Sequence, residues 1–303
     1  MTSFRPLRPR AAFLAASLLA LGVALAPLAT ASLARAAEQQ PEARAFKLGA
    51  FNLVALHDAQ FTPPNDGKIF GVGVGPAAVT QVLQAAGAPT DHITLSVDAL
   101  LVKTGQQVVL IDTGVGGALQ GSLKLAKVKP ESVTDILITH AHPDHVGGLV
   151  KNGALAFPNA KIHMTAAEWP WLQSQEKMAD MVKVISPQVE TFEPGAEVVP
   201  GITSVEIKGH TPGHTGYEIV SGNNRLLDFG DTAHSSIVSL AKPTWHISFD
   251  TDQDVGEESR VEMLTKLAKS QETIFAPHFP FPGVGKIEPQ ADHFVWKPTL
   301  SVK

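Results

Sequence analysis

Residues 139–148, Thr-His-Ala-His-Pro-Asp-His-Val-Gly-Gly, place three histidines and one aspartate within six positions. The run follows an apolar segment, residues 135–138, that is typical of a buried strand. Pro143 prevents a helix from beginning before it, so the first histidines are expected on extended chain. Four side chains of this kind directly after a strand predict a metal site rather than a histidine-rich surface loop.

The two halves of this run are expected to serve different metal ions. On an extended segment, side chains two positions apart point the same way, so His140 and His142 can hold one ion together. Asp144 and His145 come where the chain turns into a helix, and they can face a second ion. Imidazole nitrogens and carboxylate oxygens are the ligands that zinc takes where thiolate is absent, and this chain contains no cysteine.

The pattern His-x-His-x-Asp-His resembles the signature of the metallo-β-lactamase-fold hydrolases. Three later segments match the remaining motifs of that family: residues 209–215 (Gly-His-Thr-Pro-Gly-His-Thr), 226–231 (Leu-Leu-Asp-Phe-Gly-Asp) and 274–278 (Ile-Phe-Ala-Pro-His). The resemblance covers residues 46–300 and implies an α/β (α+β) fold, a four-layer αββα sandwich with ligands on loops at one edge. The implied ligands are His140, His142 and His214 for one metal, Asp144, His145 and His278 for the other, and Asp231 between them.

Two choices within these motifs rest on local chain geometry. The resemblance implies that His214 is the ligand. Pro212 and Gly213 argue against a helix on which His210 and His214 could bind metal as a pair, so His210 is interpreted as a residue that stabilises the loop. His210→Ala is then expected to keep metal and Asp231→Ala to lose both ions. Asp228 lies inside the expected strand and lacks the preceding glycine that lets backbone approach the site, so it is not expected to bind metal.

Asp112 follows an apolar strand, residues 109–111, and precedes Thr-Gly. The resemblance places its carboxylate where it orients a ligand histidine through the free ring N–H. The alternative is an aspartate that only forms a turn.

The resemblance implies two zinc ions per subunit, with iron or mixed metals left open, and a metal-bound hydroxide that attacks an ester-like centre. Residues 155–160 and 278–283 resemble the branch that contains methyl parathion hydrolase and related lactonases. Lactones, aryl esters and organophosphate triesters are therefore the expected substrates. A strict lactonase without phosphotriesterase activity and a non-catalytic metal-binding protein of the same fold remain alternatives.

Substrate contacts are predicted from weaker signals. His234 stands three residues after Asp231, where homoserine lactonases of this fold carry a tyrosine, so it is a second catalytic candidate beside Asp231. It can equally be a loop residue without a role. Trp171, Trp169 and Phe192 are candidates for an aromatic pocket wall, although aromatic side chains more often belong to a core.

Composition limits the choice of partners. The chain has 303 residues, of which 44% are hydrophobic, and this is ample for one large core. Its formal net charge is −5, and no basic stripe is visible, which disfavours a nucleic-acid partner. A small-molecule ester-like substrate is the expected partner, and a homodimer is left open.

Residues 1–36 are predicted to be a signal peptide, followed by a hydrolase domain over residues 37–303. Three arginines precede an apolar stretch, residues 11–29, and residues 34–36 (Ala-Arg-Ala) offer a cleavage site. No two arginines are adjacent, which favours the general secretory route and a periplasmic or secreted, membrane-free enzyme. An uncleaved membrane anchor is the alternative.

The remaining chain predicts alternating strands and helices. We expect a first strand over residues 46–57 and helices over residues 76–86 and 256–269. Residues 68–96 are the least informative part, and their helix could be a lid or a subunit contact.

Overall fold

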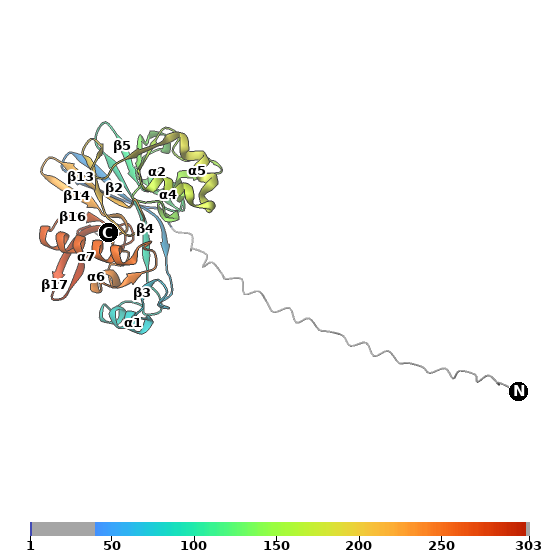
Figure 1. Ribbon diagram of the computed structural model, residues 1–303. Coiled ribbons are helices and arrows are strands. Elements are labelled where there is room, and N and C mark those ends of the chain that lie inside the picture. Colours follow the sequence, from blue (N-terminus) through green and yellow to red (C-terminus); the bar gives the residue numbers. More distant parts are fainter. Residues whose placement is uncertain (2–39, 301–303) are drawn as a thin grey trace. The chain divides into compact units, whose positions relative to one another are not determined.

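The computed structural model describes Met1 and residues 40–300. Apart from Met1, the predicted signal peptide lies outside the described residues. Within residues 40–300, no helix combines the length and the apolar character needed to cross a membrane. Two seven-stranded sheets form the centre of this part of the chain (Figure 1).

The first sheet runs, in order across it, through β1 (Glu42–Leu48), β2 (Phe51–Phe61), β4 (Leu95–Lys103), β5 (Val108–Ile111), β6 (Asp135–Leu137), β9 (Lys161–Thr165) and β10 (Val189–Phe192). The strands from β1 to β5 pair antiparallel, whereas β5, β6, β9 and β10 pair parallel. Parallel strands end at the same edge of a sheet, so the loops that follow β5 and β6 lie together.

The second sheet runs through β11 (Glu197–Val199), β12 (Ile202–Glu206), β13 (Thr215–Ser221), β14 (Asn224–Asp228), β16 (Thr273–Phe275), β17 (Val284–Gln290) and β18 (His293–Pro298). Only β14 and β16 pair parallel, so the loops after these two strands also share an edge. Two short pairs join β3 (Phe70–Val72) to β15 (His246–Ile247) and β7 (Val150–Lys151) to β8 (Ala154–Leu155).

The α-helices are α1 (Pro76–Ala85), α2 (Leu119–Leu125), α3 (Pro143–Val146), α4 (Glu168–Ser174), α5 (Ala179–Ile185), α6 (Val238–Ala241) and α7 (Gln253–Ser270). Short 3-10 turns are η1 (Pro130–Ser132), η2 (Gly147–Leu149), η3 (Glu176–Met178), η4 (Ser186–Gln188) and η5 (Gly230–Thr232).

Alternating side chains along the strands build the layers. In β2, Leu53 joins a core that both sheets share, whereas Val54 joins the core under α2, α4 and α5. In β14, Leu226 faces the shared core and Leu227 faces α7. The two sheets therefore pack face to face with helices outside each, and the predicted four-layer αββα sandwich is confirmed.

The expected elements are largely present, with one correction. The single strand expected over residues 46–57 is wrong, because the chain turns at Gly49, with a φ of 56°, and forms the hairpin of β1 and β2. The helix predicted over residues 256–269 is confirmed as part of α7. It begins at Gln253 because the Asp252 side chain accepts a hydrogen bond from the Val255 N–H at the helix start.

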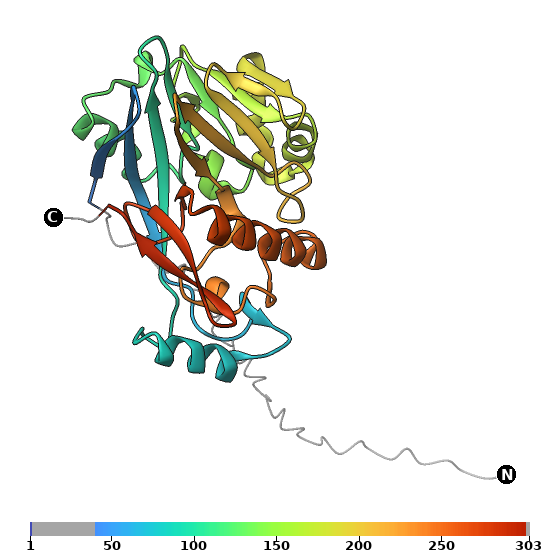
Figure 2. The same cartoon turned by 90° about the vertical axis from the view of Figure 1, so that its left-hand side faces the viewer.

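The helix predicted over residues 76–86 is confirmed as α1. Val79 and Leu83 on α1 pack with Phe70, Ile247 and neighbours in a small separate core. Figures 1 and 2 both show α1 at the opposite end of the folded part from α5. Residues 62–94 are therefore an excursion between β2 and β4 outside the sandwich.

Candidate metal centre

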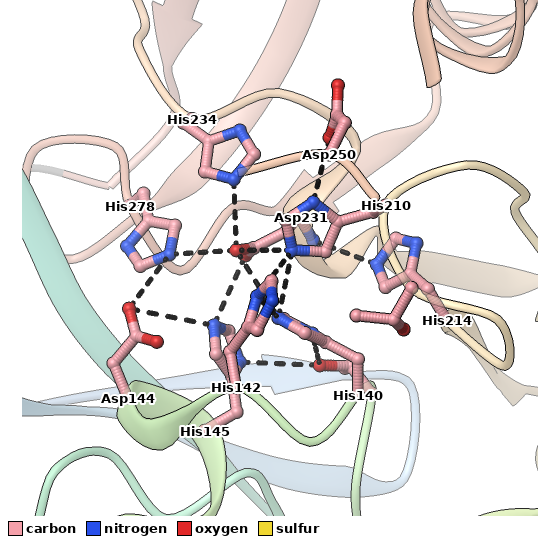
Figure 3. Close-up of polar contacts among 12 residues, drawn as sticks. His140, His142, Asp144, His145, His210, His214, Asp231, His234, Asp250 and His278 are labelled. Carbon is pink, nitrogen blue, oxygen red and sulfur yellow. Dashed lines mark hydrogen bonds and ion pairs between the residues drawn. The ribbon is translucent and has the colours of Figure 1, made fainter. Parts of the chain in front are cut away.

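Seven histidine and aspartate side chains converge in the loops that follow β6, β12, β14 and β16 (Figure 3). They are His140, His142, Asp144, His145, His210, Asp231 and His278. The loops after β14 and β16 share one edge because these two strands pair parallel, whereas the loop of His210 follows β12, which pairs antiparallel with β13.

One group contains three imidazoles. The Nε2 atom of His210 lies 3.0 Å from Nε2 of His140 and 2.9 Å from Nδ1 of His142. Asp231 Oδ2 lies 3.4 Å from the same His210 atom. A neutral imidazole has one N–H, so three ring nitrogens this close cannot all be paired with one another. A tetrahedral zinc with Zn–N bonds of about 2.0–2.1 Å needs ligand atoms at about this spacing.

Asp144, His145 and His278 form the second group. Asp144 Oδ2 lies 3.6 Å from His278 Nε2 and 4.0 Å from His145 Nε2. Asp231 also contacts this group, since its Oδ1 lies 3.3 Å from His145 Nε2 and its Oδ2 lies 3.2 Å from His278 Nε2. The carboxylate of Asp231 thus faces both groups.

The donor set fits a pair of metal ions. His145 Nε2 and Asp231 Oδ1 are buried and have no hydrogen-bond partner among the described residues. Buried polar atoms without partners are costly, and a metal ion between them would satisfy both. Imidazole and carboxylate together suit zinc, iron and similar divalent ions.

Three histidine rings are held in orientation by hydrogen bonds at their Nδ1 atoms. Nδ1 of His145 lies 2.7 Å from Asp112 Oδ2, Nδ1 of His210 lies 2.8 Å from Asp250 Oδ1, and Nδ1 of His278 donates to the Ser96 carbonyl at 2.6 Å. Each Nδ1–H is thereby used, so each Nε2 is left as an acceptor toward the centre.

Asp112 makes the contact predicted for it. Its carboxylate lies beside His145 and also accepts hydrogen bonds from the backbone N–H and the hydroxyl of Thr139. The φ of Asp112 is 59°, in a region that non-glycine residues rarely adopt. The strained backbone directs this buried carboxylate at the loop that carries the first ligands.

The structure brings His210, and not the predicted ligand His214, together with His140, His142 and Asp231. His214 Nε2 accepts a 3.0 Å hydrogen bond from the Asp231 backbone N–H, and its Nδ1 donates to the Ile207 carbonyl. A Cβ atom at Gly230 would lie only 2.5 Å from His214 Nε2, so the ring is packed against backbone. Both ring nitrogens of His214 are engaged in hydrogen bonds to backbone. His210 lies beside His140 and His142, where His214 was expected.

Burial and neighbouring charge explain the protonation of the site. Burial and the nearby His210 lower the pKa of His214 to about 3, so its Nε2 is free to accept. Burial alone would raise the pKa of Asp231, but His278 and His145 hold it well below its usual range. Asp231 is therefore an ionised carboxylate surrounded by imidazoles.

Asp250 and Arg260 belong to the site but were not predicted from the sequence. Arg260 is 2% exposed and donates to the backbone carbonyls of Pro243 and Trp245, with one guanidinium nitrogen 3.4 Å from Asp250 Oδ2. Arg260 shares the buried face of α7 with Met263 and other apolar residues. A charged residue on an otherwise apolar face was the signal for this ion pair.

His234 lies in the centre as well. It is 1% exposed, and its Nε2 lies 3.1 Å from Asp231 Oδ2. Its ring stacks on that of His278 at a centroid distance of 5.6 Å. The structure thus places His234 buried among the two groups of candidate ligands.

The aromatic candidates divide between site and core. The Trp171 ring lies 5.6 Å from His142, beside the first group. Trp169 packs against the core under α4 and α5, as Trp171 also does. Phe192 is partly buried, lies beside Tyr217 and packs against the core between the sheets, so the structure does not bring it to the metal centre.

A family model described as the metallo-beta-lactamase superfamily matches residues 93–278, which include every residue of the two metal groups. Among curated proteins, the uncharacterized protein YobT of Bacillus subtilis is 25% identical over 57% of this chain and 78% of its own length. An N-acyl homoserine lactonase of Bacillus cereus is 29% identical over 46% of this chain and 64% of its own length.

Two solved structures resemble nearly the whole described chain. The dizinc quorum-quenching lactonase AidC, in complex with a product, superposes with a TM-score of 0.82 at 29% identity and covers 87% of this chain and 99% of its own. The hydrolase AbOPH superposes with a TM-score of 0.80 at 28% identity and covers 88% of this chain and 100% of its own.

Proposed function

The chain belongs to the metallo-beta-lactamase superfamily and is a metallo-hydrolase with lactonase relatives, and from this premise we propose that it hydrolyses lactones at a two-metal centre. The observation that carries the proposal is the pair of ligand groups joined by Asp231. We assign His140, His142 and His210 to one ion and Asp144, His145 and His278 to the other. Zinc is the proposed metal, in keeping with the dizinc relative.

Two metal ions held a few ångströms apart supply a hydroxide nucleophile at neutral pH and polarise the oxygen of a substrate. The chain's own residues prepare this chemistry. Asp112, Asp250 and the Ser96 carbonyl fix the rings of three ligand histidines, so that ligand geometry is set before substrate binds. Asp231 stays ionised and compensates the positive charge of both halves.

His234 is the proposed proton donor of the site. Its buried Nε2 lies at the centre, 3.1 Å from Asp231 Oδ2, where it can donate a hydrogen bond to the oxygen of a reacting carbonyl or to a departing alkoxide. The only tyrosine of the chain, Tyr217, is buried and donates to the Ile138 carbonyl, so it is engaged elsewhere. Trp171 forms a wall beside His142.

The relatives favour a lactone over the other ester-like substrates. The curated homoserine lactonase and AidC are both named for lactone hydrolysis, at 29% identity each. A lactone carbonyl gains negative charge in its transition state, which suits a cationic centre. Phosphotriester cleavage and metal binding without catalysis are the competing outcomes. Export through residues 1–36, to the periplasm or medium, remains a prediction.

The test is a rate comparison on the purified zinc-loaded protein. We expect kcat/KM for an aryl lactone such as dihydrocoumarin, or for an N-acyl homoserine lactone, to exceed that for a dimethyl aryl phosphotriester by about a hundredfold, equivalent to about 2.7 kcal/mol of transition-state preference. The reverse preference would assign the chain to phosphotriester hydrolysis. No turnover of either substrate by protein that holds two metals would favour the non-catalytic alternative.

A further inference from the structure

Glu168 is a buried carboxylate that the sequence gives no reason to select. It begins α4, is 1% exposed, and has no part in either group of metal ligands. Its Oε1 accepts a 2.7 Å hydrogen bond from the Ala141 N–H. Its Oε2 accepts hydrogen bonds of 2.8 Å each from the Gly213 N–H and the Thr211 hydroxyl. Three donors thus surround one carboxylate that has little contact with water.

These three donors share a position relative to the ligands. Ala141 lies between His140 and His142, and Thr211 follows His210 directly. Among the described residues, all the hydrogen bonds of the Glu168 carboxylate therefore end on the two segments that supply the first ligand group. None of its partners lies beside Asp144, His145 or His278.

A second contact joins the same stretch of chain to the His210 loop. The Thr165 hydroxyl donates to the Gly213 carbonyl at 2.8 Å and accepts from the Glu168 N–H at 3.2 Å. A Cβ atom at Gly213 would collide with Thr165 Oγ1 and with the Glu168 backbone. The loop is thus pressed against residues 165–168, and the close approach requires the glycine.

We propose that Glu168 is a positioning residue that locks the segment of His140 and His142 to the segment of His210 and so sets the metal affinity of one half of the centre. This inference rests on the proposed two-metal site. An ionised carboxylate can accept from all three donors at once, whereas a glutamine of the same size offers one acceptor oxygen and turns an NH₂ group toward a donor. In the other half of the centre, Asp112 orients His145 and the Ser96 carbonyl orients His278.

The experiment is a titration of metal-free protein with Zn²⁺, followed by calorimetry, in the wild-type chain and in Glu168→Gln. We expect two binding events in the wild type. In Glu168→Gln, one event should weaken by about 10- to 100-fold, as is usual when a residue that orients metal ligands is lost, while the other changes by less than about 3-fold. Thr211→Val removes only one of the three donors and should weaken the same event by a smaller factor.

Asp135→Asn is the matched control. Asp135 is also a buried carboxylate, 3.0 Å from His163, at the start of β6 and away from both ligand groups. The Asp135→Asn substitution should lower the melting temperature of the metal-free protein without changing either zinc-binding event. Equal weakening of both events in Glu168→Gln, or no weakening beyond that in Asp135→Asn, would overturn the inference. If Glu168→Gln does not fold, Thr211→Val decides by the same criterion.

The result is separable from that of the proposed function. Selective weakening of one event in a protein that hydrolyses no lactone would support the positioning role and contradict the substrate. Lactone hydrolysis with equal weakening of both binding events would support the proposed substrate and contradict the positioning role.

Discussion

Asp231→Ala is expected to lose both of the proposed metal ions and to reduce lactone kcat/KM by at least about 10³-fold, since these ions would supply both the nucleophile and the polarising charge. The reason lies in the position of one carboxylate. Asp231 Oδ2 lies 3.4 Å from His210 Nε2 and 3.2 Å from His278 Nε2, and Oδ1 lies 3.3 Å from His145 Nε2. Its loss also leaves the two ions without the negative charge between them.

Metal content per chain and hydrolysis rate are measured together. Asp228→Asn is the matched control, because Asp228 is a buried carboxylate three residues earlier whose pKa burial raises well above its usual range. An asparagine there is close to the neutral native acid and keeps an acceptor for the Gly230 N–H. The control should keep two metals and a rate within about 3-fold of wild type. Two equivalents of metal in Asp231→Ala would contradict the assignment of Asp231.

His210→Ala and His214→Ala are expected to differ sharply. His210 supplies the nitrogen on which His140 and His142 converge, so its loss should weaken binding of one ion by at least about 100-fold and abolish most activity. His214 holds the Asp231 backbone and the Ile207 carbonyl, so its loss should cost about 1–3 kcal/mol of stability and leave metal stoichiometry unchanged at saturating zinc.

Metal analysis and urea unfolding of the two variants check this difference. A His214→Ala protein with one metal and a His210→Ala protein with two would restore the assignment expected from the sequence. The comparison is informative because both residues are histidines of one loop, at most 2% exposed, and differ only in what their nitrogens contact.

The sequence was sufficient for the fold, and its local motifs pointed to most of the side chains that the structure brings together. A strand followed at once by His-x-His-x-Asp-His fixes both the position and the direction of four side chains. The strands that precede Asp231 and His278 could be recognised in the same way. Family resemblance then supplied the order of the layers, which strand patterns alone do not determine.

The choice between His210 and His214 could not be made in this way. Pro212 and Gly213 do exclude a helix, but they do not say which ring faces the metals. That depends on Asp250, 40 residues later, which holds His210, and on the Asp231 N–H, which occupies His214. Both partners come from other loops, so the roles are set by tertiary contacts.

Glu168 could not be selected from the sequence for a related reason. Two of its three partners are backbone N–H groups, which every residue except proline offers, so no residue pattern marks the contact. Phe192 shows a different difficulty, because its aromatic character does not distinguish a pocket wall from the end of β10, where it packs against the core between the sheets.

Anomalous diffraction from crystals of the purified protein, with data at the zinc and iron absorption edges, tests the central claim most directly. We predict two peaks per chain, one contacting His140, His142 and His210 and the other contacting Asp144, His145 and His278, with Asp231 between them. No peak at either edge, or a single peak, would contradict the two-metal centre, and a peak bound to His214 instead of His210 would contradict the assignment of its ligands.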